Sequence, residues 1–202
     1  VVTWWWIGDI VSGVGLGNQD NLAQLSTALL VGSGGAFVLS LVNSFKKVIS
    51  PALVLAFAAL EGVALGALSK AFDSMFQDGI ITTAVLGTFA AFAGTLAAYK
   101  FFDIKVGQKF RTFVIAAMFG MVGLGLLSML LSFAGIQTGL FGFGNLGLLT
   151  AIVGLALGVF MLILDFDFVE NGVAAGLPER ESWRAAFGLA ASPVWIYTNL
   201  LR

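Results

Sequence analysis

Long apolar stretches, separated by short segments of charged and turn-forming residues, dominate the pattern of the chain. From Thr112 to Leu164 there is no Lys, Arg, Asp or Glu. About 18 or more apolar residues in succession indicate a transmembrane helix, and this run is too long for one crossing of a hydrocarbon core roughly 30 Å thick. Glycines between Gly135 and Gly147 divide it in two. The pattern therefore predicts an all-α, polytopic membrane helix bundle, because a β-barrel would alternate apolar and polar residues.

Seven transmembrane helices are expected, forming a single transmembrane domain over residues 1–202. The expected spans are about 1–11, 22–45, 51–72, 80–99, 112–134, 146–168 and 183–202. We expect the first and the last to be clipped, because the chain starts inside the apolar segment VVTWWWI without a Met or a signal-peptide layout. Pro193 lies inside the last span, which leaves a broken helix and a partly inserted helix as two alternatives.

Basic residues gather in alternate connections between the expected spans. They are Lys46 and Lys47 after the second span, Lys100, Lys105, Lys109 and Arg111 after the fourth, and Arg180 and Arg184 after the sixth. Short loops rich in Lys and Arg remain on the cytoplasmic side of a membrane. The amino terminus is therefore expected in the cytoplasm and the carboxyl terminus outside.

Composition narrows the chemistry of the protein. The chain is 59% hydrophobic, carries a net charge of −1, and contains neither Cys nor His. We therefore expect no nucleic-acid partner, no disulfide and no cofactor. Without His, the chain also lacks the commonest metal ligand and the usual side chain that titrates near neutral pH. No nucleophile elbow or metal-ligand cluster is apparent, so we do not expect an enzyme.

Two carboxyl groups are expected at membrane depth, where a charged side chain needs a functional or structural reason. Glu61 lies near the middle of the third span, and Asp165 lies near the end of the sixth. Residues two apart on a helix point about 200° from each other, so Asp165 and Asp167 cannot share one pocket. Asp165 is expected to face the bundle, where desolvation makes its ionisation sensitive to pH. Asp167 is expected to face water together with Glu170 and Asn171.

Each of these residues also has a purely structural interpretation. Asp165 is interpreted either as a proton sensor or as a hydrogen-bonded interior carboxyl group, and Glu61 either as its coupled partner or as a neutral acid bonded across helices. Lys46 and Lys47 are interpreted in two ways. Either their side chains extend to the interface and fix the orientation of the span, or one of them forms an ion pair with Asp165. For Asn199, a hydrogen bond between helices is the simplest interpretation.

Two long segments resemble the Bax inhibitor-1 (TMBIM) family, with its bacterial YccA- and YetJ-like members. They are FKKVISPALVLAFAALEGVALGALSKAF and LDFDFVENGVAAGLPERESWRAAFGL, the second followed by WIYTNLL. The resemblance covers nearly the whole chain. It implies a multi-pass protein of the bacterial inner membrane in which six helices surround a central seventh.

The resemblance also implies a function, that of a pH-sensitive calcium leak channel. In the family, two hydrogen-bonded aspartates form the sensor and a basic residue of the second helix acts as a latch. The first aspartate corresponds to Asp165, and the latch falls near Lys46 or Lys47. The second corresponds to Asn199, an amide that cannot titrate. The switch is then expected either as Asp165 bonded to Asn199 or as Asp165 coupled to Glu61.

Calcium prefers several oxygen ligands, so Asp165, Asn199 and backbone carbonyls are expected to offer at most a weak, transient site. Besides the lipid bilayer, the resemblance implies a second kind of partner. The alternative function is an interaction protein that modulates a membrane protease or a stress response. A proton-coupled transporter of a small solute is the third hypothesis, which only Glu61 supports at mid-depth.

Overall fold

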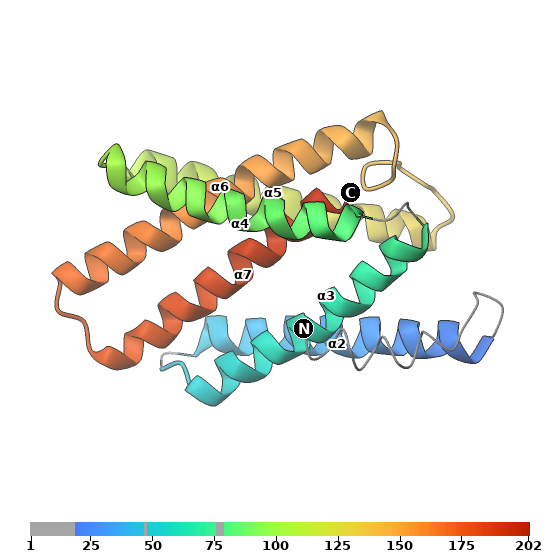
Figure 1. The fold of residues 1–202 in the computed structure, drawn as a ribbon, viewed down its shortest axis with the longest axis horizontal. Coiled ribbons are helices and arrows are strands. Elements are labelled where there is room, and N and C mark those ends of the chain that lie inside the picture. Colours follow the sequence, from blue (N-terminus) through green and yellow to red (C-terminus); the bar gives the residue numbers. More distant parts are fainter. Residues whose placement is uncertain (1–18, 47, 76–78) are drawn as a thin grey trace. The chain divides into compact units, whose positions relative to one another are not determined.

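The computed structural model describes residues 19–46, 48–75 and 79–202, so the expected span 1–11 and the candidate latch Lys47 lie outside the described residues. Within them the chain forms six α-helices and one short 3-10 helix (Figure 1). Their bounds are α2 Gln19–Phe45, α3 Pro51–Met75, α4 Ile80–Phe101, α5 Gln108–Phe133, α6 Asn145–Ala174, η1 Glu179–Glu181 and α7 Ser182–Leu200. The all-α membrane fold is confirmed.

Five of these helices, α2 to α6, are long and apolar enough to cross a membrane. Helix α7 does not belong to this group, and the count of seven spans therefore stays a prediction. Pro193 does not end α7, which continues from Ser182 to Leu200 as one helix. Helix α6 reaches Ala174 and is longer than the expected span, so Asp167 lies about two turns inside the helix.

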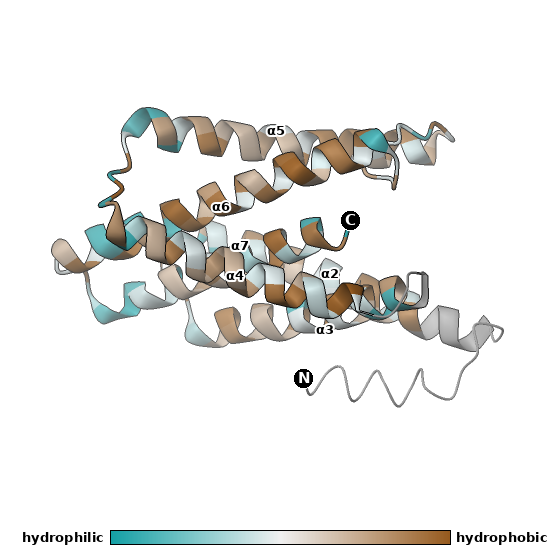
Figure 2. Ribbon diagram, turned by 45° about the horizontal axis from the view of Figure 1, so that its top comes forward, coloured by the Kyte–Doolittle hydropathy of each residue, from teal (hydrophilic) through white to brown (hydrophobic). Residues whose placement is uncertain are grey.

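Large apolar side chains cover the outside of the long helices, as a membrane protein requires. On α5, Phe113, Phe119 and Phe133 are exposed, and Figure 2 shows mainly hydrophobic residues along this helix. A helix satisfies its backbone hydrogen bonds internally, so it can lie in the hydrocarbon core without unpaired N–H or C=O groups. Its apolar side chains can then contact the acyl chains. These exposed surfaces are consistent with contact to lipid.

The chain divides into two compact units, of which the first comprises residues 1–82 and 178–187. Its centre is the contact between α2 and α3. A Cβ atom at Gly32 would lie 2.8 Å from the backbone nitrogen of Ala64, so only glycine permits this close approach. Phe57 of α3 and Phe187 of α7 form an edge-to-face pair with ring centroids 4.8 Å apart. The interpretation of the chain as one domain stays a prediction.

The second unit comprises residues 83–177 and 188–202 and contains most of α4 and α7 together with α5 and α6. Its apolar core consists of Tyr99, Leu162, Phe166 and Ile196, contributed by α4, α6 and α7. The ring of Phe92 packs edge to face on Phe166, with centroids 5.6 Å apart. This core holds α6 against α7 and thereby positions Asp165.

Candidate functional site at the contact of α6 and α7

Helices α6 and α7 approach so closely that glycines are required at their contact. A Cβ atom at Gly158 of α6 would lie 2.6 Å from the Cγ1 atom of Ile196. A Cβ atom at Gly188 of α7 would lie 2.8 Å from the Oδ1 atom of Asp165. Small residues at helix crossings allow such contacts in membranes. The carboxyl group of Asp165 therefore lies directly against the backbone of α7.

Asp165 is partly buried and accepts a hydrogen bond of 2.5 Å from the hydroxyl group of Ser192. Ser192 is only 1% exposed, so this bond is shielded from solvent. Leu162, one turn before Asp165, is fully buried, in agreement with the face of α6 that the sequence predicts to be internal. Ser192 was not among the residues predicted for the site. The sequence does indicate it, because Ser192 lies seven residues before Asn199, which places both polar side chains on one face of α7.

Asn199 occupies a different place along this contact. Its side-chain nitrogen donates to the carbonyl of Trp195 at 2.8 Å, and its oxygen accepts a bond of 2.8 Å from Arg202. It packs against Gly154, where a Cβ atom would lie 2.7 Å from the Cγ atom of Asn199. The Trp195 indole also donates to the Gly154 carbonyl at 2.8 Å.

The expected hydrogen bond between Asp165 and Asn199 is therefore not formed, and this expectation is corrected. Gly154, which contacts Asn199, lies on α6 about 16 Å from Asp165 at a rise of about 1.5 Å per residue. Ser192 takes the position opposite the carboxyl group instead. The physical reason is the axial offset of the two helices, which depends on their packing and is not encoded in either helix alone.

Asp167 differs from the expectation that it faces water. Its side chain is 9% exposed and accepts a bond of 2.7 Å from the guanidinium of Arg111 on α5. The expectation is wrong because α6 continues for about two turns past Asp167, so this residue lies within the helix and its carboxylate pairs with Arg111 of α5. The sequence contained a signal for this pair, because Arg111 is the last basic residue before the long uncharged run and Asp167 lies just beyond its end.

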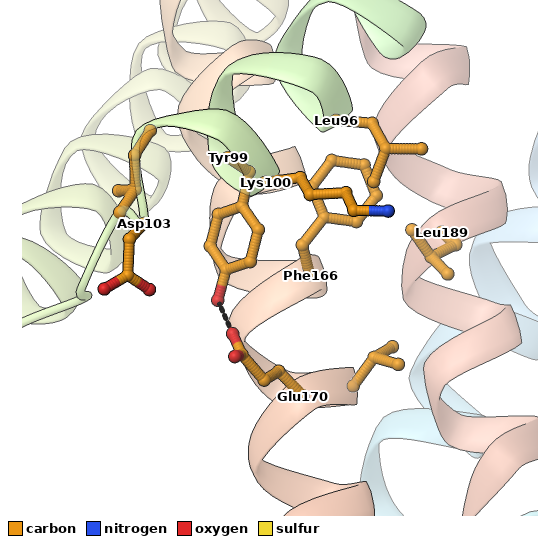
Figure 3. A pocket seen from close by; sticks show the side chains of 9 residues that line it. Leu96, Tyr99, Lys100, Asp103, Phe166, Glu170 and Leu189 are labelled. Atoms are coloured by element: carbon orange, nitrogen blue, oxygen red, sulfur yellow. Dashed lines mark hydrogen bonds between the residues drawn. The ribbon is translucent and has the colours of Figure 1, made fainter.

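Glu170 and Asn171 are exposed, as expected, but both are bonded. The hydroxyl group of Tyr99 on α4 donates to Glu170 at 2.5 Å (Figure 3). The amide of Asn171 donates to the carbonyl of Asp167 at 2.8 Å. The end of α6 is thus attached to α4 through Tyr99 and to α5 through Arg111.

Glu61 and Lys46 belong to the first unit. Glu61 is partly buried on α3, and Lys46 is exposed after the end of α2. Their coupling to Asp165, and the role of Lys46 as a latch, stay predictions. No group of three or more acidic, His or Cys side chains could hold a metal ion in the described parts of the chain. A weak calcium site at Asp165 likewise stays a prediction.

A family model for Bax inhibitor 1 like proteins matches residues 1–202. The chain belongs to the Bax inhibitor 1 like family. Its five long apolar helices make it a multi-pass membrane protein of this family. No curated protein and no solved structure gives a significant match to the chain.

Proposed function

We propose that this Bax inhibitor 1 like protein is a pH-sensitive leak channel for cations, calcium in particular, in which protonation of Asp165 controls the contact between α6 and α7. The observation that carries this proposal is the position of the Asp165 carboxyl group. It lies against Gly188 and bonds to Ser192, and no basic side chain of the described residues in its own unit forms an ion pair with it.

The proposed gating follows from the different solvation of the two forms of the carboxyl group. A neutral carboxyl group bonded to a hydroxyl group is compatible with close helix packing. An ionised carboxylate in a poorly hydrated contact is unfavourable unless water or a cation reaches it. Ionisation of Asp165 should therefore weaken its contact with α7 and attract cations, whereas protonation should close the contact.

The same residues support a leak better than tight calcium binding. Calcium takes six to eight oxygen ligands. The described contact offers one carboxyl group at Asp165, the hydroxyl group of Ser192 and backbone carbonyls. Such an incomplete set of ligands favours brief occupancy, which a conducting path requires.

The test is calcium flux into liposomes at about pH 6 and about pH 8, values that bracket the ionisation of a desolvated carboxyl group. Wild type should conduct better at the higher pH. Asp165→Asn, which imitates the neutral acid, should conduct little at either pH. Glu179→Gln, an exposed acid before α7, is the matched control and should behave as wild type. Equal flux of wild type and Asp165→Asn at both pH values would refute the proposal.

A further inference from the structure

A pocket of about 380 Å³ opens beside the end of α4, between this helix, α6 and α7 of the second unit. Leu96, Phe166 and Leu189 supply apolar walls, and Lys100 and Glu170 supply opposite charges (Figure 3). Its volume is within the range of small-molecule sites, about 300–1,000 Å³. None of the interactions proposed for the gate involves this pocket.

The two charged groups of the pocket are separated and available. Glu170 is held by the Tyr99 hydroxyl through its Oε2 atom, which leaves Oε1 without a bond to a described residue. Lys100 forms no hydrogen bond or ion pair with any described residue. Figure 3 shows the Lys100 ammonium on the side of Leu189 and the Glu170 carboxylate on the side of Tyr99. The pocket thus presents a positive and a negative site with apolar side chains between them.

Asp103 adds a second carboxylate in a backbone conformation that L-residues seldom adopt. Its φ angle is 47°, just after the end of α4, where the Ile104 amide donates to the Tyr99 carbonyl at 3.3 Å. Glycine is the usual residue at such a helix end. Asp103 lines the pocket, but its carboxylate is 83% exposed and pairs with the ammonium of Lys105 at 3.6 Å, so Glu170 is the carboxylate available to a ligand.

The surroundings of the pocket place it at the level of lipid headgroups. It lies where the membrane-spanning helix α4 ends. Phe101 and Phe102, next to Lys100, are 82% and 79% exposed, whereas the following loop is rich in basic residues. A loop rich in Lys and Arg directly after an apolar span is typical of the boundary between acyl chains and water. A lipid is therefore the molecule most often presented to this opening.

We propose that the pocket binds the headgroup of a phospholipid that carries both a phosphate and a primary ammonium group, as phosphatidylethanolamine does. The phosphate would lie beside Lys100, and the ammonium would donate to Glu170. The glycerol and the first methylenes would contact Leu96 and Phe166. A purely anionic headgroup would leave Glu170 without a cation, and a quaternary ammonium has no N–H to donate to Glu170.

The test is native mass spectrometry of the purified full chain offered equal amounts of phosphatidylethanolamine and phosphatidylcholine with identical acyl chains. A parallel sample receives phosphatidylglycerol, and another receives free phosphoethanolamine without acyl chains. Wild type should retain phosphatidylethanolamine about tenfold over phosphatidylcholine, the ratio expected for one charge-assisted hydrogen bond. Free phosphoethanolamine should bind much more weakly than the lipid, because the apolar walls then contribute nothing.

Two variants separate the roles of the two charges, and a third serves as the control. Lys100→Gln should lower retention of both zwitterionic lipids, because both carry the phosphate. Glu170→Gln should abolish the preference between them while leaving phosphatidylcholine retention unchanged. Lys109→Gln, an exposed lysine outside the pocket, is the control and should retain lipid as wild type.

The inference would be overturned by equal retention of the two lipids in wild type, by preferential retention of phosphatidylglycerol, or by a preference that survives Glu170→Gln. Because lipid retention is measured without ion flux, its outcome is independent of the proposed channel function.

Discussion

The ion pair between Arg111 and Asp167 allows a quantitative test of how α5 holds α6. The two side chains differ in exposure: Arg111 is 45% exposed, whereas Asp167 is 9% exposed. Removal of the arginine would leave a carboxylate without its charged partner in a nearly closed site. Removal of the carboxylate would leave a guanidinium that can turn toward water. The two substitutions should therefore destabilise the protein unequally.

The expected magnitudes follow from this asymmetry. Breaking a fully buried pair costs about 3–5 kcal/mol, and an exposed pair contributes about 0–1 kcal/mol. With one partner half exposed, Arg111→Gln should lower the free energy of unfolding by about 2 kcal/mol. Asp167→Asn should lower it by only about 1 kcal/mol, because Asn still accepts a hydrogen bond from Arg111.

The assay is reversible unfolding in mixed micelles with increasing SDS, followed by tryptophan fluorescence. The double variant completes a thermodynamic cycle and should be about as stable as Asp167→Asn alone. Once Asp167 no longer carries a charge, replacing Arg111 removes little further stabilisation. Lys105→Gln is the control: Lys105 pairs with Asp103 at 3.6 Å, but both side chains are more than 80% exposed, at 87% and 83%, so no change is expected.

A larger loss for Asp167→Asn than for Arg111→Gln would refute the argument from exposure. Additive effects in the double variant would show that the two side chains do not interact in the membrane protein.

Three further predictions use the same unfolding assay. Ser192→Ala should destabilise by about 1–3 kcal/mol, because it removes the hydroxyl bonded to the α6 carboxyl group, and it should shift the pH of half-maximal calcium flux. Gly154→Ala should destabilise by about 1–3 kcal/mol through collision with Asn199, whereas Gly120→Ala, with open space around it, should be neutral or stabilising. Asp103→Gly should stabilise by up to about 1 kcal/mol by relieving the positive φ angle. These predictions would be contradicted if the change in unfolding free energy had the opposite sign for either glycine variant. They would also be contradicted if Ser192→Ala were as stable as wild type, or if Asp103→Gly were less stable.

The helices and their approximate bounds could be predicted because the bilayer imposes two strong conditions. A spanning segment must be apolar over the thickness of the hydrocarbon core, and its backbone must bond within itself. The uncharged run from Thr112 to Leu164 meets these conditions so clearly that α5 and α6 follow from it, apart from their extensions at the ends. A glycine in an apolar helix does not by itself indicate close packing. Gly158 of α6 packs closely on α7, but nothing lies within 4 Å of a Cβ atom built at Gly120 of α5.

The sequence by itself determined that this is an all-α membrane protein with a carboxyl group on an inward face of α6, because run length and helical periodicity are properties of single segments. Only the tertiary structure decided that Asp165 bonds to Ser192 and not to Asn199, and that Asp167 pairs with Arg111. Partners across a helix contact depend on how far one helix is shifted and rotated against the next. That shift is set by the packing of Gly154, Gly158 and Ile196, which no pattern along a single helix records.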